Sequence, residues 1–192
     1  MPRPESQPED YRSGKTVTSD EELMSAAAGG DMDAFEELVR RHQQSAINVA
    51  YRMLGDAHRA QDTAQEAFLR ILESARRYRP TAGFRTYLYR ILTRLCIDIY
   101  RKRAPGASDQ LDAETDPSEA PPEAVLRDER QELVRRAIDG LPGRQKLALV
   151  LQHYEDLSYE EIAVVLKCST KAVDALLVRA KRTLKEALKD LM

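Results

Sequence analysis

The stretch SYEEIAVVLKCSTKAVDALLVRAKR, from Ser158 to Arg182, has the pattern of two short helices around a tight turn. Glu161 follows Ser158 by three residues, a spacing at which each side chain can bond a backbone N–H at a helix start. A second hydroxyl cap occupies the short connection, and apolar residues recur at helical spacing on both sides. This pattern favours a DNA-reading helix-turn-helix over its alternative, an amphipathic hairpin that only packs a core.

The second of these helices carries the polar and basic side chains that such a reader needs. Residues at its start can meet base edges in the major groove, and basic residues further along can meet phosphates. The candidate contacts are Ser169, Thr170, Lys171, Arg179, Lys181 and Arg182.

Composition indicates a helical protein of one domain or two small ones. The chain has 192 residues, of which 42% are hydrophobic and 32% charged. The first twenty residues lack the apolar run of a signal peptide, and no segment approaches the length that spans a bilayer, so a cytoplasmic protein without membrane insertion is expected. Cys96 and Cys168 lie in apolar helical patterns, which favours reduced buried thiols, and neither a metal site nor a cofactor is predicted.

Charge is strongly segregated along the chain, although the net charge is only −2. Nine basic residues and one acidic residue lie between Arg76 and Arg103, whereas Ala104 to Glu123 holds six acidic residues and no basic one. This order is typical of a DNA-contacting helix followed by a solvated linker. A solvated helix face beside a flexible loop would have the same charges.

Hydrophobic periodicity predicts an all-α fold with two small helical domains. Residues 1–19 are predicted to be a disordered tail, and residues 20–103 a helical domain. Residues 104–123 are acidic, contain four prolines and lack periodicity, so they are expected to form a flexible linker between two cores. Residues 124–192 form the domain that ends in the helix-turn-helix.

Four stretches, in this order, resemble the extracytoplasmic-function (ECF) sigma factors, the compact two-domain group of the bacterial sigma-70 family. They are GDMDAFEELVRRH at 30–42, AQDTAQEAFLRIL at 60–72, FRTYLYRILTRLCIDIYRKR at 84–103, and the segment 141–184 that begins LPGRQKLALVLQHYEDLSYEEIA. The resemblance covers about residues 20–192. It implies region 2 in the first domain, region 4 in the second, and a non-enzymatic subunit that gives core RNA polymerase its promoter specificity.

The resemblance also assigns roles to polar residues of the first domain. Asp62, Gln65, Glu66 and Arg70, opposite an apolar stripe, match the face that docks on core polymerase, although a solvated helix face would have the same pattern. Thr63 stands where the family has a branched aliphatic residue. The helix at 84–103 and the loop before it match the elements that capture unpaired bases of the −10 element, with candidate contacts Tyr78, Arg79, Arg85, Tyr87, Tyr89, Arg90 and Arg94.

Two of these tyrosines are expected to differ in their surroundings. Tyr87 stands where the family commonly has Trp, and it also belongs to the apolar stripe, so base contact and core packing are equally open to it. Tyr89 is expected on another face, free to meet DNA with Arg85, Arg90 and Arg94.

In the second domain the resemblance implies recognition of duplex DNA at the −35 element. Asp174 joins the candidate contacts there, since it can accept a hydrogen bond from cytosine or orient a nearby arginine. The resemblance also implies an anti-sigma partner. The rival hypotheses are a stand-alone helix-turn-helix regulator, which would bind an operator as a symmetric dimer without polymerase, and a helical interaction protein whose basic block is only a solvated surface.

Overall fold

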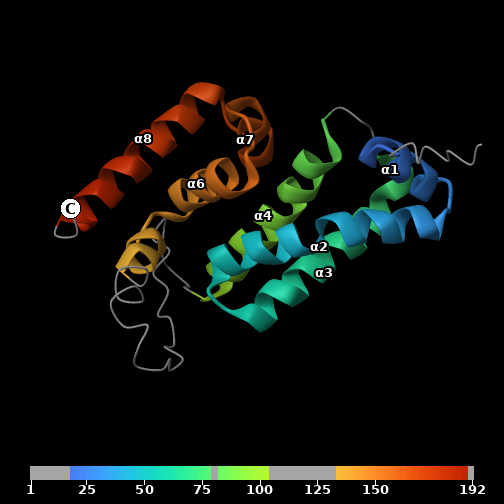
Figure 1. Cartoon of the computed structure of the whole chain (residues 1–192), viewed down its shortest axis with the longest axis horizontal. Helices are drawn as coiled ribbons and strands as arrows, with labels where there is room; N and C mark the ends of the chain where they lie inside the picture. Colours follow the sequence, from blue (N-terminus) through green and yellow to red (C-terminus); the bar gives the residue numbers. More distant parts are fainter. Residues whose placement is uncertain (1–17, 79–81, 104–132, 190–192) are drawn as a thin grey trace, which may run out of the picture.

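The computed structural model describes residues 18–78, 82–103 and 133–189, and all regular secondary structure within these ranges is helical (Figure 1). The predicted linker at 104–123 and residues 1–17 of the predicted tail lie outside the described residues. The helices are α1 (Asp20–Ala28), α2 (Met32–Leu54), α3 (Ala57–Ser74), the short 3-10 helix η1 (Ala75–Arg77), α4 (Phe84–Arg103), α6 (Gly143–Glu155), α7 (Tyr159–Leu166) and α8 (Thr170–Ala187). Residues 133–139 are also helical.

Side-chain caps fix where the first helices begin. Ser19 and Glu22 form a capping box at the start of α1, and Asp31 accepts a hydrogen bond from the Ala34 N–H at the start of α2. Gly55 ends α2 with φ 68°, a left-handed conformation that glycine adopts without strain. The Asp56 side chain then caps α3, so the chain reverses direction within two residues.

Helices α1 to α4 pack into the first group, whose apolar stripes face one another (Figure 1). Cys96 of α4 is fully buried, as the sequence predicted, and burial raises the pKa of its thiol to about 12. The largest fully buried side chains of this group are Met24, Leu38, Met53, Ile71, Phe84, Leu88, Tyr89 and Leu92.

The second group contains residues 133–139 and helices α6, α7 and α8. Leu147, Leu151, Ile162 and Leu177 are almost fully buried and fill its interior. Lys146 is also buried, and its Nζ lies 2.7 Å from a carboxylate oxygen of Asp139. A buried ammonium needs such a partner, so this pair ties the start of α6 to the preceding helical segment.

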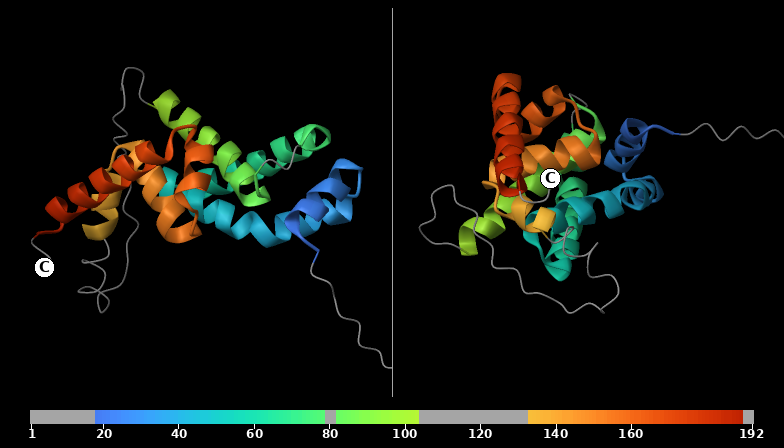
Figure 2. Two further views of the ribbon diagram at one scale, coloured as in Figure 1. Left: turned by 90° about the horizontal axis from the view of Figure 1, so that it is seen from above. Right: turned by 60° about the vertical axis from the view of Figure 1, so that its left-hand side comes forward.

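The two helix groups pack directly against each other. Helix α4 contacts α7 and α2 contacts α6, and Figure 2 shows α6 and α7 against the first group from two further directions. The buried apolar side chains form one continuous cluster that includes residues of both groups. The expectation of two separated cores therefore does not describe this arrangement, because α4 is covered by the first group on one face and by α7 on another.

Candidate nucleic-acid and partner interfaces

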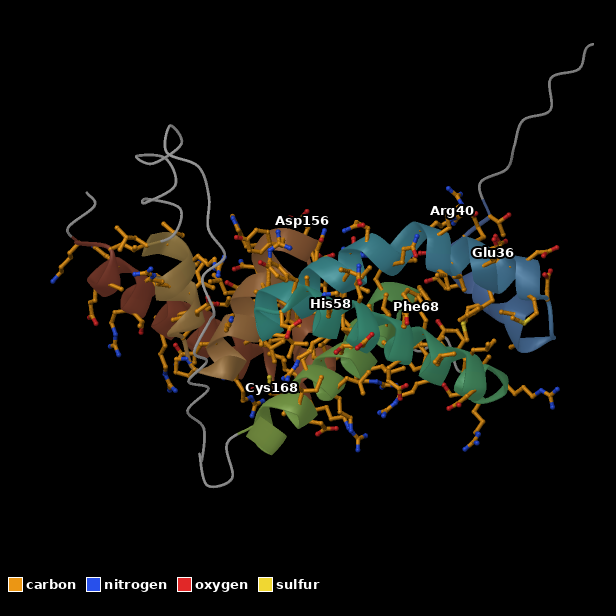
Figure 3. The ribbon with its side chains drawn as sticks, turned by 90° about the horizontal axis from the view of Figure 1, so that it is seen from below. Glu36, Arg40, His58, Phe68, Asp156 and Cys168 are labelled. Atoms are coloured by element: carbon orange, nitrogen blue, oxygen red, sulfur yellow. The ribbon has the colours of Figure 1, made fainter. Side chains whose placement is uncertain are left out.

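The helix-turn-helix forms as the sequence predicts. Ser158 and Glu161 make the reciprocal capping box of α7, and Lys167 ends that helix in a left-handed conformation with φ 50°. The Ser169 hydroxyl then accepts a hydrogen bond from the Ala172 N–H, 3.2 Å away, and caps α8. Figure 3 labels Cys168 in the turn between the two helices, where its side chain is half-buried.

Helix α8 presents every predicted contact residue to solvent. Val173, Leu177 and Ala180 are its buried residues and fix which face points inward. The rest of the helix surface and its cap expose Ser169, Thr170, Lys171, Asp174, Arg179, Lys181 and Arg182. An amphipathic helix held by its apolar face leaves a basic and polar face free for a groove.

The polar face predicted on α3 is also at the surface. Asp62, Gln65 and Arg70 are exposed and Glu66 is half-buried, with Arg70 Nε 2.7 Å from Glu66 Oε1. Leu69, next to Arg70 in the sequence, is 55% exposed. Its exposure was not predicted, although its position outside the apolar stripe could have indicated it. A single exposed leucine is common on protein surfaces, so the polar residues around it, and not Leu69 alone, define this face.

Thr63, which stands at a position expected to be aliphatic, is buried on the inner side of α3. Its hydroxyl donates a hydrogen bond to the carbonyl oxygen of Arg59 at 2.6 Å. This bond satisfies the hydroxyl within its own helix, so the threonine packs without leaving a buried polar atom unpaired.

The start of α4 and the end of η1 bring together two of the predicted aromatic residues. The rings of Tyr78 and Tyr87 lie 5.1 Å apart, and the Tyr87 hydroxyl lies 2.7 Å from the Ser74 hydroxyl. The Arg90 guanidinium lies 5.3 Å from the centre of the Tyr87 ring, and Tyr87 itself is half-buried. Arg90 and Arg94 are exposed, whereas Arg79 lies outside the described residues.

Tyr89 does not lie on a free face, and that expectation is wrong for this arrangement. Its side chain is fully buried, and its hydroxyl donates a hydrogen bond to Glu155 Oε2 at the end of α6. Burial, reinforced by this carboxylate, raises the pKa of Tyr89. Helical periodicity within the first domain could not reveal that the second helix group covers this side of α4.

Two neighbours of Tyr89 also contact the second group. Arg85 Nη2 donates to the Glu155 carbonyl oxygen at 2.5 Å, and the hydroxyl of the buried Thr86 lies 3.4 Å from Glu161 Oε1. Arg85 is itself still partly exposed, with 46% of its side-chain surface accessible. We call Arg85, Thr86 and Tyr89 the α4 contact set.

A long-range cap positions the beginning of α4. Glu21 of α1 accepts a hydrogen bond from the backbone N–H of Phe84 at 3.1 Å, across 63 residues of sequence. A carboxylate at a helix start is favoured by the unpaired N–H groups and the helix dipole. Glu21 therefore joins α1 to the loop before α4, a contact with no local signal in the sequence.

Replacing Glu21 with alanine is expected to loosen the start of α4. Loss of a helix cap costs roughly 0.5–2 kcal/mol, whereas Glu21→Gln keeps an acceptor oxygen and should lose less. Amide hydrogen exchange at Phe84 and Arg85 measures the effect. Equal protection in the wild type and in Glu21→Ala would contradict the capping role.

No helix in the described ranges combines the length and apolar character needed to cross a membrane. The same residues contain no cluster of three or more His, Cys, Asp or Glu side chains that could hold a metal ion.

Comparisons with known proteins agree with the helix order and the helix-turn-helix. Residues 38–105 match the family model of sigma-70 region 2, and residues 131–184 match that of sigma-70 region 4. The chain is therefore a two-domain member of the sigma-70 family. Its similarity to named relatives places it in the ECF group of that family, whose members are transcription initiation factors rather than enzymes.

Three relatives show the extent of the similarity. The chain is 35% identical over 188 residues to the RNA polymerase sigma-H factor of Pseudomonas aeruginosa, covering 92% of this chain and 97% of the relative. It is 33% identical to the ECF RNA polymerase sigma factor SigW of Bacillus subtilis, covering 84% and 92%. The ECF RNA polymerase sigma-E factor of Escherichia coli K12 is 28% identical, with 91% and 96% covered.

Two solved structures share the fold. CnrH, in complex with the cytosolic domain of CnrY, aligns with a TM-score of 0.69 at 28% identity, covering 90% of this chain and 99% of CnrH. RpoE of Bartonella quintana, in complex with the anti-sigma factor NepR, aligns with a TM-score of 0.64 at 19% identity, covering 81% and 96%.

Proposed function

We propose that this chain binds core RNA polymerase through α3, places α8 on duplex DNA at the −35 element, and holds unpaired bases of the −10 element at the start of α4. The observation that carries the proposal is the surface of α8, which exposes all seven predicted contacts on a correctly capped helix-turn-helix. Phosphodiester synthesis belongs to the polymerase. The experiment is capture of core polymerase by the purified chain, followed by transcription from a promoter that requires it.

The same experiment separates this proposal from its rivals. A stand-alone regulator protects an operator without polymerase and has no need of core binding. A helical interaction protein gives no promoter-dependent transcript.

An anti-sigma factor is part of the proposal. CnrH and the Bartonella RpoE were both solved as complexes, with CnrY and with an anti-sigma factor, respectively. A partner of this class would hold the chain away from polymerase, and it would be tested by co-purification from the source cells.

The α3 face is tested by the triple substitution Asp62→Ala, Gln65→Ala and Glu66→Ala. We expect weaker holoenzyme assembly with nearly unchanged thermal stability. Among the described residues, the ion pair that is lost is the exposed one between Glu66 and Arg70, and exposed pairs contribute about 0–1 kcal/mol. The matched control removes the same three residue types from α2, as Asp33→Ala, Glu36→Ala and Gln43→Ala. Wild-type affinity for core polymerase in a folded α3 triple variant would exclude this face.

The basic side chains of α8 are expected to contribute to all duplex sequences alike. Removing Arg179, Lys181 or Arg182 should weaken holoenzyme binding to duplex promoters and lower the slope of log K against log salt by about 0.9 per lost phosphate contact. Lys171→Ala should instead lose roughly 1–3 kcal/mol of binding only on −35 sequences that carry the base contacted by Lys171, so the variant discriminates less between −35 sequences. A sequence-dependent loss in Arg179→Ala, with a uniform loss in Lys171→Ala, would reverse the assignment.

A further inference from the structure

The turn between α6 and α7 presses two carboxylates against the start of α4. Glu155 is the last residue of α6 and is only 6% exposed, and Glu161 lies in the first turn of α7. Asp156, labelled in Figure 3, follows Glu155 at the turn. The three residues of the α4 contact set each offer a donor to these acidic residues: the Tyr89 and Thr86 hydroxyls and the Arg85 guanidinium.

Glu155 occupies a position that is unfavourable without these partners. A carboxylate at the C-terminal end of a helix lies beside carbonyl oxygens of the same sign, and a buried carboxylate without partners loses its hydration. Tyr89 supplies a hydrogen bond to Oε2, and Arg85 Nη2 lies 3.6 Å from the same oxygen. The closed arrangement of the two helix groups therefore depends on donors that belong to α4.

The carboxylate oxygens that receive the Tyr89 and Thr86 hydroxyls are anionic acceptors, like the phosphate oxygens of DNA. The Arg85 guanidinium bonds the Glu155 carbonyl oxygen and forms an ion pair with its carboxylate. Tyr89 is fully buried in this arrangement and its hydroxyl is bonded to Glu155, so a nucleic acid strand has no access to its hydroxyl or its ring while the two groups are closed. Contact with Glu155 and contact with DNA are mutually exclusive for this side chain.

We infer that Glu155 and Glu161 act as an internal substitute for single-stranded DNA, competing with the promoter for the α4 contact set. The inference rests on the proposed function, because it takes the start of α4 to be the face that receives unpaired bases. Separation of the helix groups releases Arg85, Thr86 and Tyr89 together. Capture of unpaired bases at the start of α4 therefore requires an opened factor.

The competition also explains why the contact set combines an exposed and two buried residues. Arg85 retains 46% of its side-chain surface in the closed arrangement, so part of this side chain is exposed to solvent before the groups separate. Thr86 and Tyr89 are almost fully buried in the same arrangement. Arg85 is therefore the one member of the α4 contact set that an incoming strand can reach while the groups are closed.

The test uses the full chain with Glu155→Gln, which keeps the size and an acceptor oxygen of the side chain and removes its charge. Tyr89→Phe is the second variant and removes the donor while it keeps the ring. Glu160→Gln changes an exposed residue of α7 outside the hydrogen bonds described above, and it controls for the loss of one negative charge near α4. Circular dichroism confirms that each variant is folded.

Two measurements are made on each variant. Energy transfer between dyes on Gln43→Cys and Lys185→Cys, in a Cys168→Ser background, reports the separation of the two groups. Fluorescence anisotropy reports binding of a 5′-labelled single-stranded DNA of mixed sequence, about twenty nucleotides long. Both labelling positions are exposed, and the remaining thiol, Cys96, is fully buried.

We expect Glu155→Gln and Tyr89→Phe to raise the ratio of open to closed molecules about tenfold or more, because each weakens a hydrogen bond to a buried charged group. Glu155→Gln should lower the Kd for the DNA by a similar factor, since the apparent affinity scales with the competent fraction while that fraction is small. Glu160→Gln should change either quantity by less than about twofold.

Three results would overturn the inference: Glu155→Gln stays closed, it opens without a gain in DNA affinity, or Glu160→Gln gives an equal gain. Transcription by the wild-type chain with core polymerase is measured separately. A normal transcript together with any of those three results rejects the competition and keeps the proposed function. If the variants open and gain affinity for DNA but the wild-type chain gives no transcript, the proposed function is rejected. Competition between the two glutamates and single-stranded DNA for the α4 contact set would still stand.

Discussion

The double substitution Tyr87→Ala and Arg90→Ala is expected to reduce open promoter complexes by roughly ten- to a hundredfold while initial binding to the duplex promoter remains. A base stacked on an aromatic ring contributes about 1–3 kcal/mol, and a nearby arginine adds attraction for the strand. The Tyr87 ring and the Arg90 guanidinium lie 5.3 Å apart at the start of α4. Permanganate reactivity of unpaired thymines measures melting, and a footprint of the closed complex measures duplex binding.

A structural role for Tyr87 is separated from base capture by Tyr87→Phe. This variant keeps the stacking surface and loses only the bond to Ser74, which is 2.7 Å long. We expect it to melt promoters nearly as well as the wild type. The matched control for the double variant is Tyr51→Ala with Arg40→Ala, which removes the same two residue types from exposed positions on α2. Normal melting by the Tyr87 and Arg90 variant would place base capture elsewhere.

Local sequence signals predicted the helices and their ends well, since those features depend on neighbouring residues. The capping box of Ser158 and Glu161 forms as expected, and the periodicity of α8 correctly separates the buried Val173 and Leu177 from its exposed side. A hydroxyl, its partner three residues later and a repeat of apolar residues all lie within one or two turns of helix. Helix ends and buried helix faces can therefore be predicted without knowledge of distant contacts.

The contacts that define the start of α4 could not be predicted in this way. Glu21 caps Phe84 across 63 residues, and Glu155 receives the Tyr89 hydroxyl across 66. Periodicity shows which side of α4 faces its own domain, but it does not show which side of α4 the second helix group covers. Tyr89 was expected to be free for that reason, and its burial is a property of the assembled chain.

Two adjacent residues of α8 differ strongly in burial, so their replacement should have very different effects on stability. Leu177 is 1% exposed and Val178 is 58% exposed. Leu177→Ala should lower the free energy of unfolding of the second helix group by about 2–5 kcal/mol, because it removes buried methyl groups and leaves a cavity. Val178→Ala should change it by less than about 0.5 kcal/mol, as is usual for surface positions.

The loss of stability in Leu177→Ala should affect −35 binding more than binding to core polymerase. Unfolding of the second group removes the α8 surface. The α3 face belongs to the first group, which shares a continuous buried cluster with Leu177 but also has its own contacts among α1, α2, α3 and α4. Leu177→Ala should therefore lose protection of the −35 region near its melting temperature and still capture core polymerase, while Val178→Ala behaves as the wild type. Chemical denaturation followed by circular dichroism, with capture and footprinting at the same temperatures, measures both effects. Simultaneous loss of core binding and −35 protection in Leu177→Ala would show instead that the continuous core makes the two groups unfold as one unit.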